Sequence, residues 1–287
     1  MMHRLDLRFG PVGFRIGSAW RAPLDQLARL YDGYPAAEAP ADFTVRLEPQ
    51  RPWRRFLRPS VDIGGDYRLP GAAPLPLAQG LLAAEMGMNL QMALGQRRYL
   101  LLHAGVAERG GKALILTGPS GAGKSTLAAL LGEAGWRFMG DEFALLDPAD
   151  GRLHAFPRAV SLKNEALALF EGVEAARLGP RLEGTPKGLI RHLRPNREAV
   201  ARMDEPAVPA LILFPRFGAD LPAATRPVGA AEAFVRLTQA STNYVALAER
   251  GFEALTRLVA SVPSRAIDYA SSAEALAQIE RLWGEIG

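Results

Sequence analysis

The feature that most constrains the fold of this chain is a glycine-rich octapeptide followed by a threonine. Its sequence is Gly118-Pro119-Ser120-Gly121-Ala122-Gly123-Lys124-Ser125, then Thr126, and it satisfies the full Walker A spacing G-x-x-x-x-G-K-[ST]. The apolar run Ala113–Thr117 precedes it and is typical of a strand buried on both faces. After it, apolar residues recur with helical spacing at Leu127, Leu130, Leu131 and Ala134. The segment therefore predicts a buried strand, a tight loop (a P-loop) and an inward-facing helix, which ends at Gly135.

Such a loop has the chemistry to bind a polyphosphate. Glycines let the backbone curl so that successive N–H groups converge on phosphate oxygens, and the following helix presents its positive end to the same anion. We expect Lys124 to reach the β- and γ-phosphates of a nucleoside triphosphate and the Ser125 hydroxyl to bind magnesium. The predicted nucleotide-binding segment is Gly118–Thr126, and the predicted cofactors are ATP and Mg²⁺.

Two adjacent carboxylates, Asp141 and Glu142, follow the predicted helix by one short strand, Trp136–Met139. A single crossover would bring them back beside the phosphates, and Gly140 allows a close backbone approach or a bend. One carboxylate could then hold magnesium while the other accepts the proton of an acceptor hydroxyl. The alternative is an ordinary exposed pair at the end of a strand.

His103 lies in an apolar stretch ahead of the predicted strand of the loop. A histidine in that position is either a hydrogen-bonded core residue or a group that acts at the phosphate site. The residues alone leave both interpretations open.

Composition limits the other classes of function. The chain has 287 residues, 48% apolar and 22% charged, which is an ordinary balance for a soluble protein. No apolar run approaches the roughly 20 residues that span a bilayer, and the absence of cysteine excludes disulfides and thiolate metal sites. We therefore expect a cytoplasmic protein without a membrane partner.

The net charge of +4 is carried mostly by arginine, and Arg51, Arg54, Arg55 and Arg58 form a cluster with Trp53 and Phe56. Such a mixture could bind nucleic acid. The run is short, however, and it is flanked by prolines without a nucleic-acid fold signature. We expect a solvated loop or strand edge there, and no nucleic-acid partner.

The sequence divides into a predicted N-terminal accessory region of α+β type, residues 1–98, and a P-loop domain, residues 99–287. Strands are expected at Arg4–Phe9 and Phe43–Leu47, and a helix at Pro76–Gln96. In the second region we expect a hairpin turn at Glu108–Lys112, a strand at Ala210–Phe214 and a last helix from Ser271 or Ser272. The segment Glu171–Asn196, rich in Gly, Pro and basic residues, is expected to form a long loop or lid.

The order of these motifs resembles the HPr kinase/phosphorylase family. The matching residues are His103-Ala104-Gly105-Val106, the short hairpin, Gly118–Ser125 and Gly140-Asp141-Glu142. The stretch Phe156–Asn164, and Asn243-Tyr244 followed by Gly251-Phe252, are similar to the HPr-kinase-related proteins called HprK-related kinase A. The core of the resemblance spans about Leu100–Phe170, and a weaker similarity extends through most of the chain.

The resemblance implies an α/β fold of the phosphoenolpyruvate-carboxykinase and HPr-kinase type. It also implies a kinase that transfers phosphate from ATP to a hydroxyl with magnesium, and possible assembly into homo-oligomers. It places His103 near the phosphates and Asp141 as the catalytic base. The residues themselves leave Ser125 and Glu142 as the expected ligands of the metal. Glu142 replaces the second aspartate of the family, and the Arg-Gly-Leu-Gly type stretch is missing. HPr as the acceptor and a phosphorylase activity are therefore not implied.

The nature of the acceptor stays open at this stage. A protein, a peptide and a small molecule all fit, and a basic residue is needed to complete the site. The candidates are Arg158, Lys163, Lys187, Arg191 and Arg194, unless they form a solvated basic loop. One alternative function is a nucleotide-hydrolysing switch or assembly factor that acts on a partner protein, and another is a binding module with a degenerate site.

Overall fold

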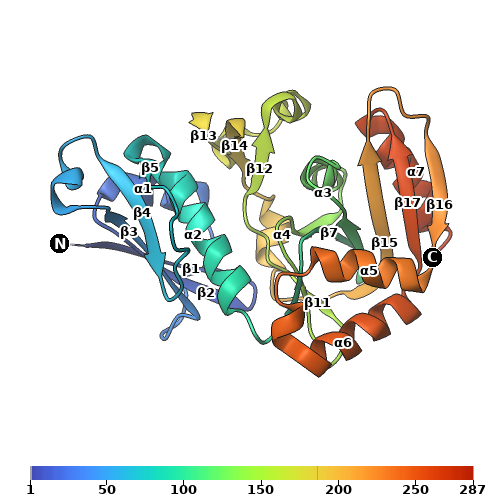
Figure 1. Ribbon diagram of the computed structural model, residues 1–287. Helices are drawn as coiled ribbons and strands as arrows, with labels where there is room; N and C mark the ends of the chain where they lie inside the picture. The colour runs from blue at the N-terminus through green and yellow to red at the C-terminus, as the bar shows by residue number, and fades with distance from the viewer. Residues whose placement is uncertain (1, 186, 287) are drawn as a thin grey trace. The chain divides into compact units, whose positions relative to one another are not determined.

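The computed structural model describes residues 2–185 and 187–286, and within them it is a mixed α/β structure with four sheets (Figure 1). The chain forms two compact units: Met1–Gln96 with Ala159–Arg194, and Arg97–Arg158 with Pro195–Gly287. The first division lies within two residues of the predicted boundary at 98. The segment Ala159–Arg194, which the sequence prediction assigned to the P-loop domain, belongs instead to the first unit.

The main sheet of the first unit has five strands in the order β1-β2-β3-β4-β5. These are β1 (His3–Phe9), β2 (Val12–Ser18), β3 (Phe43–Pro49), β4 (Ser60–Gly65) and β5 (Leu75–Pro76). Only β2 and β3 pair in parallel among these described strands, and the crossover between them contains helix α1 (Arg21–Leu30). The strands predicted at Arg4–Phe9 and Phe43–Leu47 are thereby confirmed.

The helix predicted at Pro76–Gln96 is also confirmed, as the short helix η2 (Leu77–Gln79) followed by α2 (Gly80–Gly95). Leu81, Ala84, Met88 and Met92, which recur three to four residues apart along it, are fully buried. Helix α2 packs on β3 and β4, where a side chain at Gly87 would collide with Val45. The absence of a side chain at Gly87 therefore allows the helix to lie close to the sheet.

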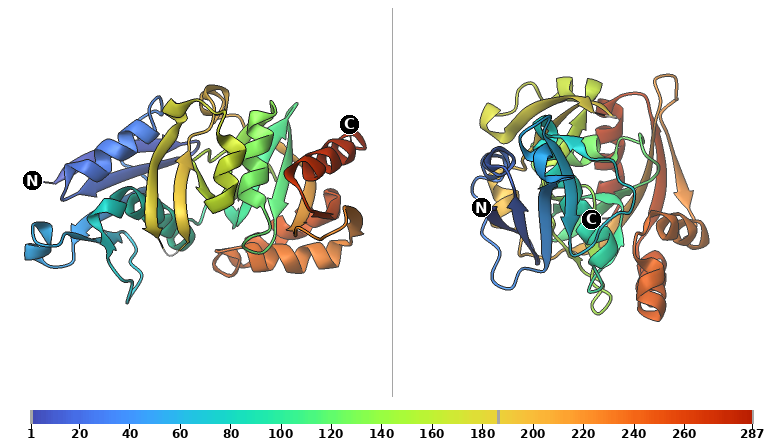
Figure 2. Two further views of the ribbon diagram at one scale, coloured as in Figure 1. Left: turned by 90° about the horizontal axis from the view of Figure 1, so that it is seen from above. Right: turned by 60° about the vertical axis from the view of Figure 1, so that its left-hand side comes forward.

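The prediction of a long loop or lid at Glu171–Asn196 is wrong. The segment contains a short helix, η4 (Ala175–Arg177), and the strands β13 (Leu178–Thr185) and β14 (Gly188–Leu193), which pair in a three-stranded sheet with β12 (Val160–Lys163). The strands β13 and β14 run side by side in yellow in the left view of Figure 2. Leu182, Ile190 and Leu193 are buried. Glycine, proline and arginine lie between these residues and obscure the apolar alternation in the sequence. The segment has a low strand propensity, but burial of its leucines and isoleucine outweighs that. A further short helix, η3 (Asn164–Phe170), follows β12.

The second unit is organised around a six-stranded sheet in the order β16-β17-β15-β8-β7-β9. The strands are β16 (Ala224–Val228), β17 (Ser264–Tyr269), β15 (Val208–Phe217), β8 (Lys112–Thr117), β7 (Ala104–Arg109) and β9 (Arg137–Gly140). Strands β15, β8 and β17 are parallel, and β7 joins β8 through the predicted hairpin. The turn of that hairpin uses Gly110 and Gly111 at φ values of 63° and 79°, which suit a tight hairpin connection.

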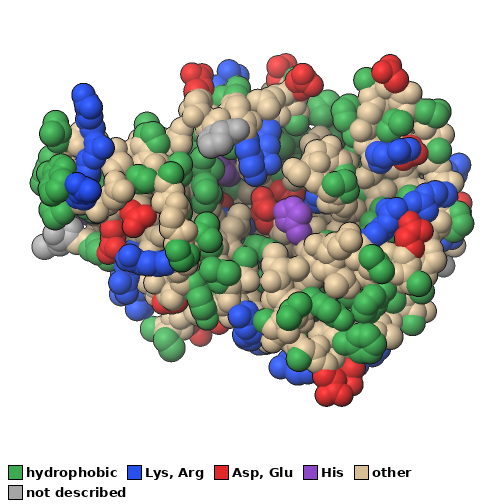
Figure 3. Space-filling model, in the orientation of Figure 1, with side chains coloured by type: hydrophobic (Ala, Val, Ile, Leu, Met, Phe, Trp, Pro, Cys, Tyr) green, Lys and Arg blue, Asp and Glu red, His purple; other side chains and the backbone are tan. Residues whose placement is uncertain are grey.

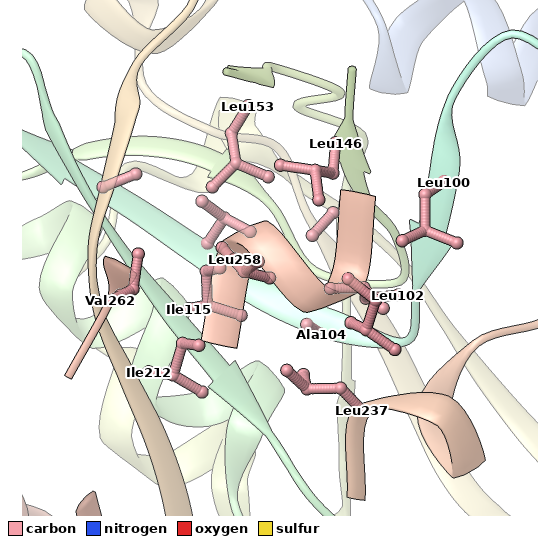
Figure 4. Packing of buried hydrophobic residues seen from close by; sticks show 14 of the residues in the cluster. Leu100, Leu102, Ala104, Ile115, Leu146, Leu153, Ile212, Leu237, Leu258 and Val262 are labelled. Carbon is pink, nitrogen blue, oxygen red and sulfur yellow. The ribbon is translucent and has the colours of Figure 1, made fainter. Parts of the chain in front are cut away.

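Helices cover both faces of this sheet. Helix α3 (Lys124–Glu133) packs on β7 and β9, and α7 (Ser272–Gly284) packs on β17 and α3. On the other face, Ala113 and Ile115 of β8 join a core cluster with Leu237 of α5 (Ala230–Ala240) and Leu258 of α6 (Tyr244–Ser261) (Figure 4). Side chains alternate between the two faces along β8, so this one strand packs against the helices on both sides of the sheet.

The same core includes a small sheet, β11 (Leu153–His154), β10 (Ala144–Leu146) and β6 (Leu100–Leu102). The remaining helices of the described chain are the short α4 (Arg197–Ala201) in this unit and η1 (Pro52–Arg55) in the first unit. None of the helices in the described part of the chain is long and apolar enough to cross a membrane.

The helix ends follow local signals closely. In α7, Ser271 Oγ accepts from the backbone N–H of Glu274 at 3.2 Å, as its capping-box spacing predicts. In α3, Leu127 and Leu131 are buried as expected, but Ala134 is exposed. The reason is that Ala134 is already the C-cap, where Gly135 at φ 87° turns the chain away.

Candidate active site

Three segments far apart in the sequence meet at one edge of the six-stranded sheet. Strands β8 and β9 both pair antiparallel with β7, so they run in the same direction and end at the same edge, where β7 begins. In register, Ala104 lies opposite Thr117, and Val106 lies opposite Gly140. The topology therefore brings His103, Gly118 and Asp141 to one edge, with the ends of β8 and β9 about 10 Å apart, two strand spacings.

The glycine-rich loop, Gly118–Gly123, follows β8 and leads directly into α3. Gly118, Gly121 and Gly123 have φ values of 155°, 85° and 87°, which few other residues adopt. A side chain at Gly123 would also collide with the hydroxyl of Tyr269. That hydroxyl donates to the carbonyl of Ala122 at 2.9 Å, and burial raises its pKa well above the usual range for tyrosine. The phenol therefore stays a hydrogen-bond donor, and Tyr269 on β17 stabilises the conformation of the loop.

Lys124 is the first residue of α3, and its side chain bends back over the loop. Its Nζ donates to the carbonyls of Gly118 at 2.7 Å and Pro119 at 3.0 Å, and the residue is buried. No side chain caps the start of the helix at Gly123. The amide groups and positive end of α3 therefore face the loop without a competing side-chain acceptor at the cap.

On the other side of β7, His103 meets the residues that follow β9. His103 Nδ1 lies 3.2 Å from the backbone carbonyl oxygen of Glu142 and 3.7 Å from its carboxylate Oε2. Both side chains are partly exposed, at 43% and 36%, whereas Asp141 is buried. The backbone of His103 is fixed because its N–H donates to Ala240 and its carbonyl accepts from Thr117 Oγ1. This edge thus carries a partly accessible imidazole–carboxylate contact next to a buried carboxylate.

The oxygen groups at this edge fit a hard cation. Within the described residues there is no cluster of three or more His, Cys, Asp or Glu that could hold a metal by itself. Magnesium at a phosphate site usually takes only one or two protein oxygens, with phosphates and water completing its octahedron. The predicted ligands Ser125, in the first turn of α3, and Glu142, after β9, provide a hydroxyl and a carboxylate of the required kind.

A cavity of about 880 Å³ adjoins the loop on the β15 side of β8. It is lined by His103, Gly118, Pro119 and Ser120, by the ends of β15, β16 and β17, and by α5 with the turn that follows it. Three arginines line it: Arg216 pairs with Asp268 at 2.6 Å, and Arg226 and Arg236 pair with Glu232 at 3.0 and 2.7 Å. Arg236 also stacks 4.9 Å from the ring centre of Phe214.

Sequence reasoning missed these arginines. They are scattered over residues 216–236, in no recognisable spacing, and only the pairing of β15, β16 and β17 brings them together. Arg216 lowers the pKa of Asp268, and Arg226 lowers the pKa of Glu232, chiefly by donating hydrogen bonds to the carboxylates. The cavity wall is thus a set of ion pairs with a small excess of positive charge.

Comparisons with known proteins add little. No family model matches the chain, and no curated protein matches it. Among solved structures, it is similar to the Hpr(Ser) kinase/phosphatase from Coxiella burnetii, with a TM-score of 0.28 and 13% identity. That match covers 64% of this chain and 98% of the other. A likeness this weak does not establish a common fold or activity.

The basic residues predicted to complete the site fall into different units. Arg158 is in the second unit, buried, with its guanidinium 5.6 Å from the ring centre of Phe156. Lys163, Lys187, Arg191 and Arg194 belong to the first unit. There, Arg191 donates to the carbonyl of Gly179 at 2.9 Å and Arg194 to that of Asp32 at 2.8 Å. Which of the five acts at the site stays a prediction.

Proposed function

We propose that this protein is an ATP- and magnesium-dependent kinase that transfers the γ-phosphate to a hydroxyl of a protein, peptide or small-molecule acceptor. The observation that supports it most is the meeting of the glycine-rich loop and Lys124 with the Asp141–Glu142 pair at one sheet edge. A phosphate-binding loop alone fits many reactions. A loop with two carboxylates at its open edge has the parts that phosphoryl transfer requires.

In this proposal Gly118–Thr126 forms a P-loop. Its amides and the N-terminus of α3 hold the phosphates, and Lys124, whose ammonium already lies across the loop, contacts the β- and γ-phosphates. Ser125 and Glu142 hold magnesium, which supplies charge neutralisation when bound. His103, beside Glu142, orients that carboxylate and faces the terminal phosphate.

Asp141 serves as the base. As the acceptor oxygen bonds to the γ-phosphorus, the bond from that phosphorus to the bridging oxygen of ATP breaks and ADP leaves. The acceptor proton passes to Asp141. The burial of Asp141 supports this role, because a positioned carboxylate acts most effectively away from bulk water.

In the same proposal the cavity holds the nucleoside. The acid pair follows β9 and the cavity adjoins β15, and these strands flank the β8–β7 pair on opposite sides. A triphosphate that crosses the loop with its terminal phosphate towards Asp141 would direct its sugar and base into the cavity. The guanidinium of Arg236, 4.9 Å from the ring centre of Phe214, offers a surface on which a base can stack.

The proposal is tested by transfer from labelled ATP to acceptors in a cell extract. We expect a labelled acceptor with the wild type, and Asp141→Asn should reduce labelling by roughly 10²–10⁴-fold while ATP still raises the melting temperature. Asp220→Asn, at an exposed position in the β15–β16 connection, is the matched control. Near-normal transfer by Asp141→Asn would exclude this base, and phosphate release without any labelled acceptor would favour the nucleotide-hydrolysing switch.

Cytoplasmic location and homo-oligomeric assembly belong to the same proposal. Light scattering of the purified chain with and without ATP would measure its mass. A monomer at all concentrations would remove the oligomer from the proposal without affecting the kinase chemistry.

A further inference from the structure

The turn between β3 and β4, residues Arg51–Arg58, combines positive charge with exposed apolar side chains; we call it the basic–apolar turn. Its eight residues include four arginines and no acidic residue. Trp53, Phe56 and Leu57 are 55%, 81% and 67% exposed. The turn projects from the end of the β3–β4 hairpin (Figures 1 and 2), and basic side chains stand beside hydrophobic ones at the left-hand end of Figure 3.

The basic–apolar turn has a fixed conformation within the first unit. The amides of Phe56 and Leu57 both donate to the carbonyl of Trp53, at 3.1 and 2.9 Å. The indole of Trp20, just before α1, donates to the carbonyl of Arg55 at 3.0 Å. The turn is therefore anchored to the body of its unit while its large apolar side chains point to solvent. Exposed apolar groups held in this way are typical of a binding surface.

Within the described part of the chain, the arginines of the turn have no carboxylate partner, although Arg54 Nη1 donates to the carbonyl of Arg58 at 3.1 Å. In residues 2–185 and 187–286, none of Arg51, Arg54, Arg55 and Arg58 forms an ion pair with a carboxylate. Two of them instead lie over the exposed rings, Arg51 at 5.4 Å from Trp53 and Arg55 at 5.6 Å from Phe56. Guanidinium groups bind phosphate oxygens in pairs and tolerate contact with apolar surface.

We propose that the basic–apolar turn docks on an anionic lipid surface. A projecting turn with outward apolar side chains suits a deformable, flat partner, because lipid chains accept Phe56 and Leu57 without a complementary pocket. Tryptophan favours the interface itself, and clustered arginines bind anionic headgroups. An acidic protein partner would need a matching cavity for each projecting side chain. This contact differs from the expectation of no membrane partner, which rested on the lack of a spanning segment. It is peripheral and independent of the kinase chemistry.

The test is flotation of the protein with two kinds of vesicle. One contains phosphatidylcholine alone, and in the other about a third of the lipid is the anionic phosphatidylglycerol. We expect binding only to the anionic vesicles, weakened by salt. Arg51→Gln with Arg55→Gln should lower partitioning roughly 30-fold, about fivefold per charge. Phe56→Ser with Leu57→Ser should lower it by roughly tenfold or more. The matched control is Val245→Ser with Arg250→Gln on α6, where Val245 is 88% exposed.

Two results would overturn the lipid proposal. One is that the wild type fails to float with anionic vesicles while it still unfolds cooperatively on heating, which shows that the protein is folded. The other is that the double variant Phe56→Ser, Leu57→Ser binds vesicles as tightly as the wild type does, and that variant and wild type also bind a short DNA duplex equally. In that case the turn is a general polyanion site and the apolar side chains take no part.

Discussion

His103 and Glu142 are in contact at one edge of the six-stranded sheet: His103 Nδ1 lies 3.7 Å from Glu142 Oε2. His103 precedes β7 and Glu142 follows β9, so the contact lies at the sheet edge next to the glycine-rich loop. In the proposed mechanism it orients the carboxylate that holds magnesium.

Glu142→Gln should raise the magnesium concentration needed for half-maximal transfer by roughly tenfold or more, because even outer partners of metal ligands contribute about 10–100-fold to affinity. The amide keeps the shape of the side chain and loses its charge. A magnesium titration of the initial rate at saturating ATP measures the effect, with Asp220→Asn as the control. An unchanged magnesium requirement would remove Glu142 from the metal site.

Lys124→Ala should abolish stabilisation by ATP. For the wild type, ATP at about a hundred times its Kd should stabilise the fold by about 2.7 kcal/mol, visible as a rise in melting temperature. Loss of the two Nζ hydrogen bonds to the loop should itself cost about 1.5–3 kcal/mol per bond, so the ATP response of each variant is measured against its own melting temperature without ATP. Lys112→Ala, an exposed position at the start of β8, should respond to ATP like the wild type. A full ATP response from Lys124→Ala would contradict the P-loop assignment.

Arg236→Gln should raise the KM for ATP by roughly 5–30-fold with little change in kcat, because a base stacked on this side chain is bound equally before and during transfer. Steady-state kinetics with ATP varied would show this, and Arg250→Gln on the surface of α6 is the control. A fall in kcat at constant KM for ATP would assign the cavity to the acceptor instead of the nucleoside.

Glu108→Gln should destabilise the second unit by roughly 3–5 kcal/mol, because it leaves the buried guanidinium of Arg137 without its counter-charge. Both side chains are almost fully buried, and Glu108 Oε2 accepts from Arg137 Nε with Arg202 also 3.5 Å away. Denaturant unfolding at pH 7 measures the loss. A change below about 1 kcal/mol would show that the pair contributes little.

The same pair gives the stability of the wild type a pH dependence. Burial alone raises the pKa of Glu108, but hydrogen bonds from Arg137 and Gly111 and the nearby arginine charges outweigh burial, so its pKa lies below the usual value. Because the unfolded chain binds the proton more readily, this stabilisation is present above pH 4.5 and is lost as pH falls through the lower folded pKa. Glu108→Gln should show a flatter loss of stability in acid.

The sequence by itself determined the local parts of this protein. The loop after β8, the start of α3, the Gly110-Gly111 hairpin and the cap of α7 were all predictable, because each depends on residues a few positions apart: positive φ at glycine, a capping hydroxyl, or apolar spacing along one element. His103 and Asp141 could be singled out for the same reason, since each adjoins a short apolar strand.

Only the tertiary structure decided which distant segments pair. The arginines of the cavity come together through β15, β16 and β17, and β13 with β14 forms a sheet where composition favoured a loop. The segment Ala159–Arg194 joins the first unit although it follows β9 and the Asp141–Glu142 pair in sequence. Strand pairing depends on burial against partners remote in the chain, so a residue's neighbours along the sequence carry little information about it.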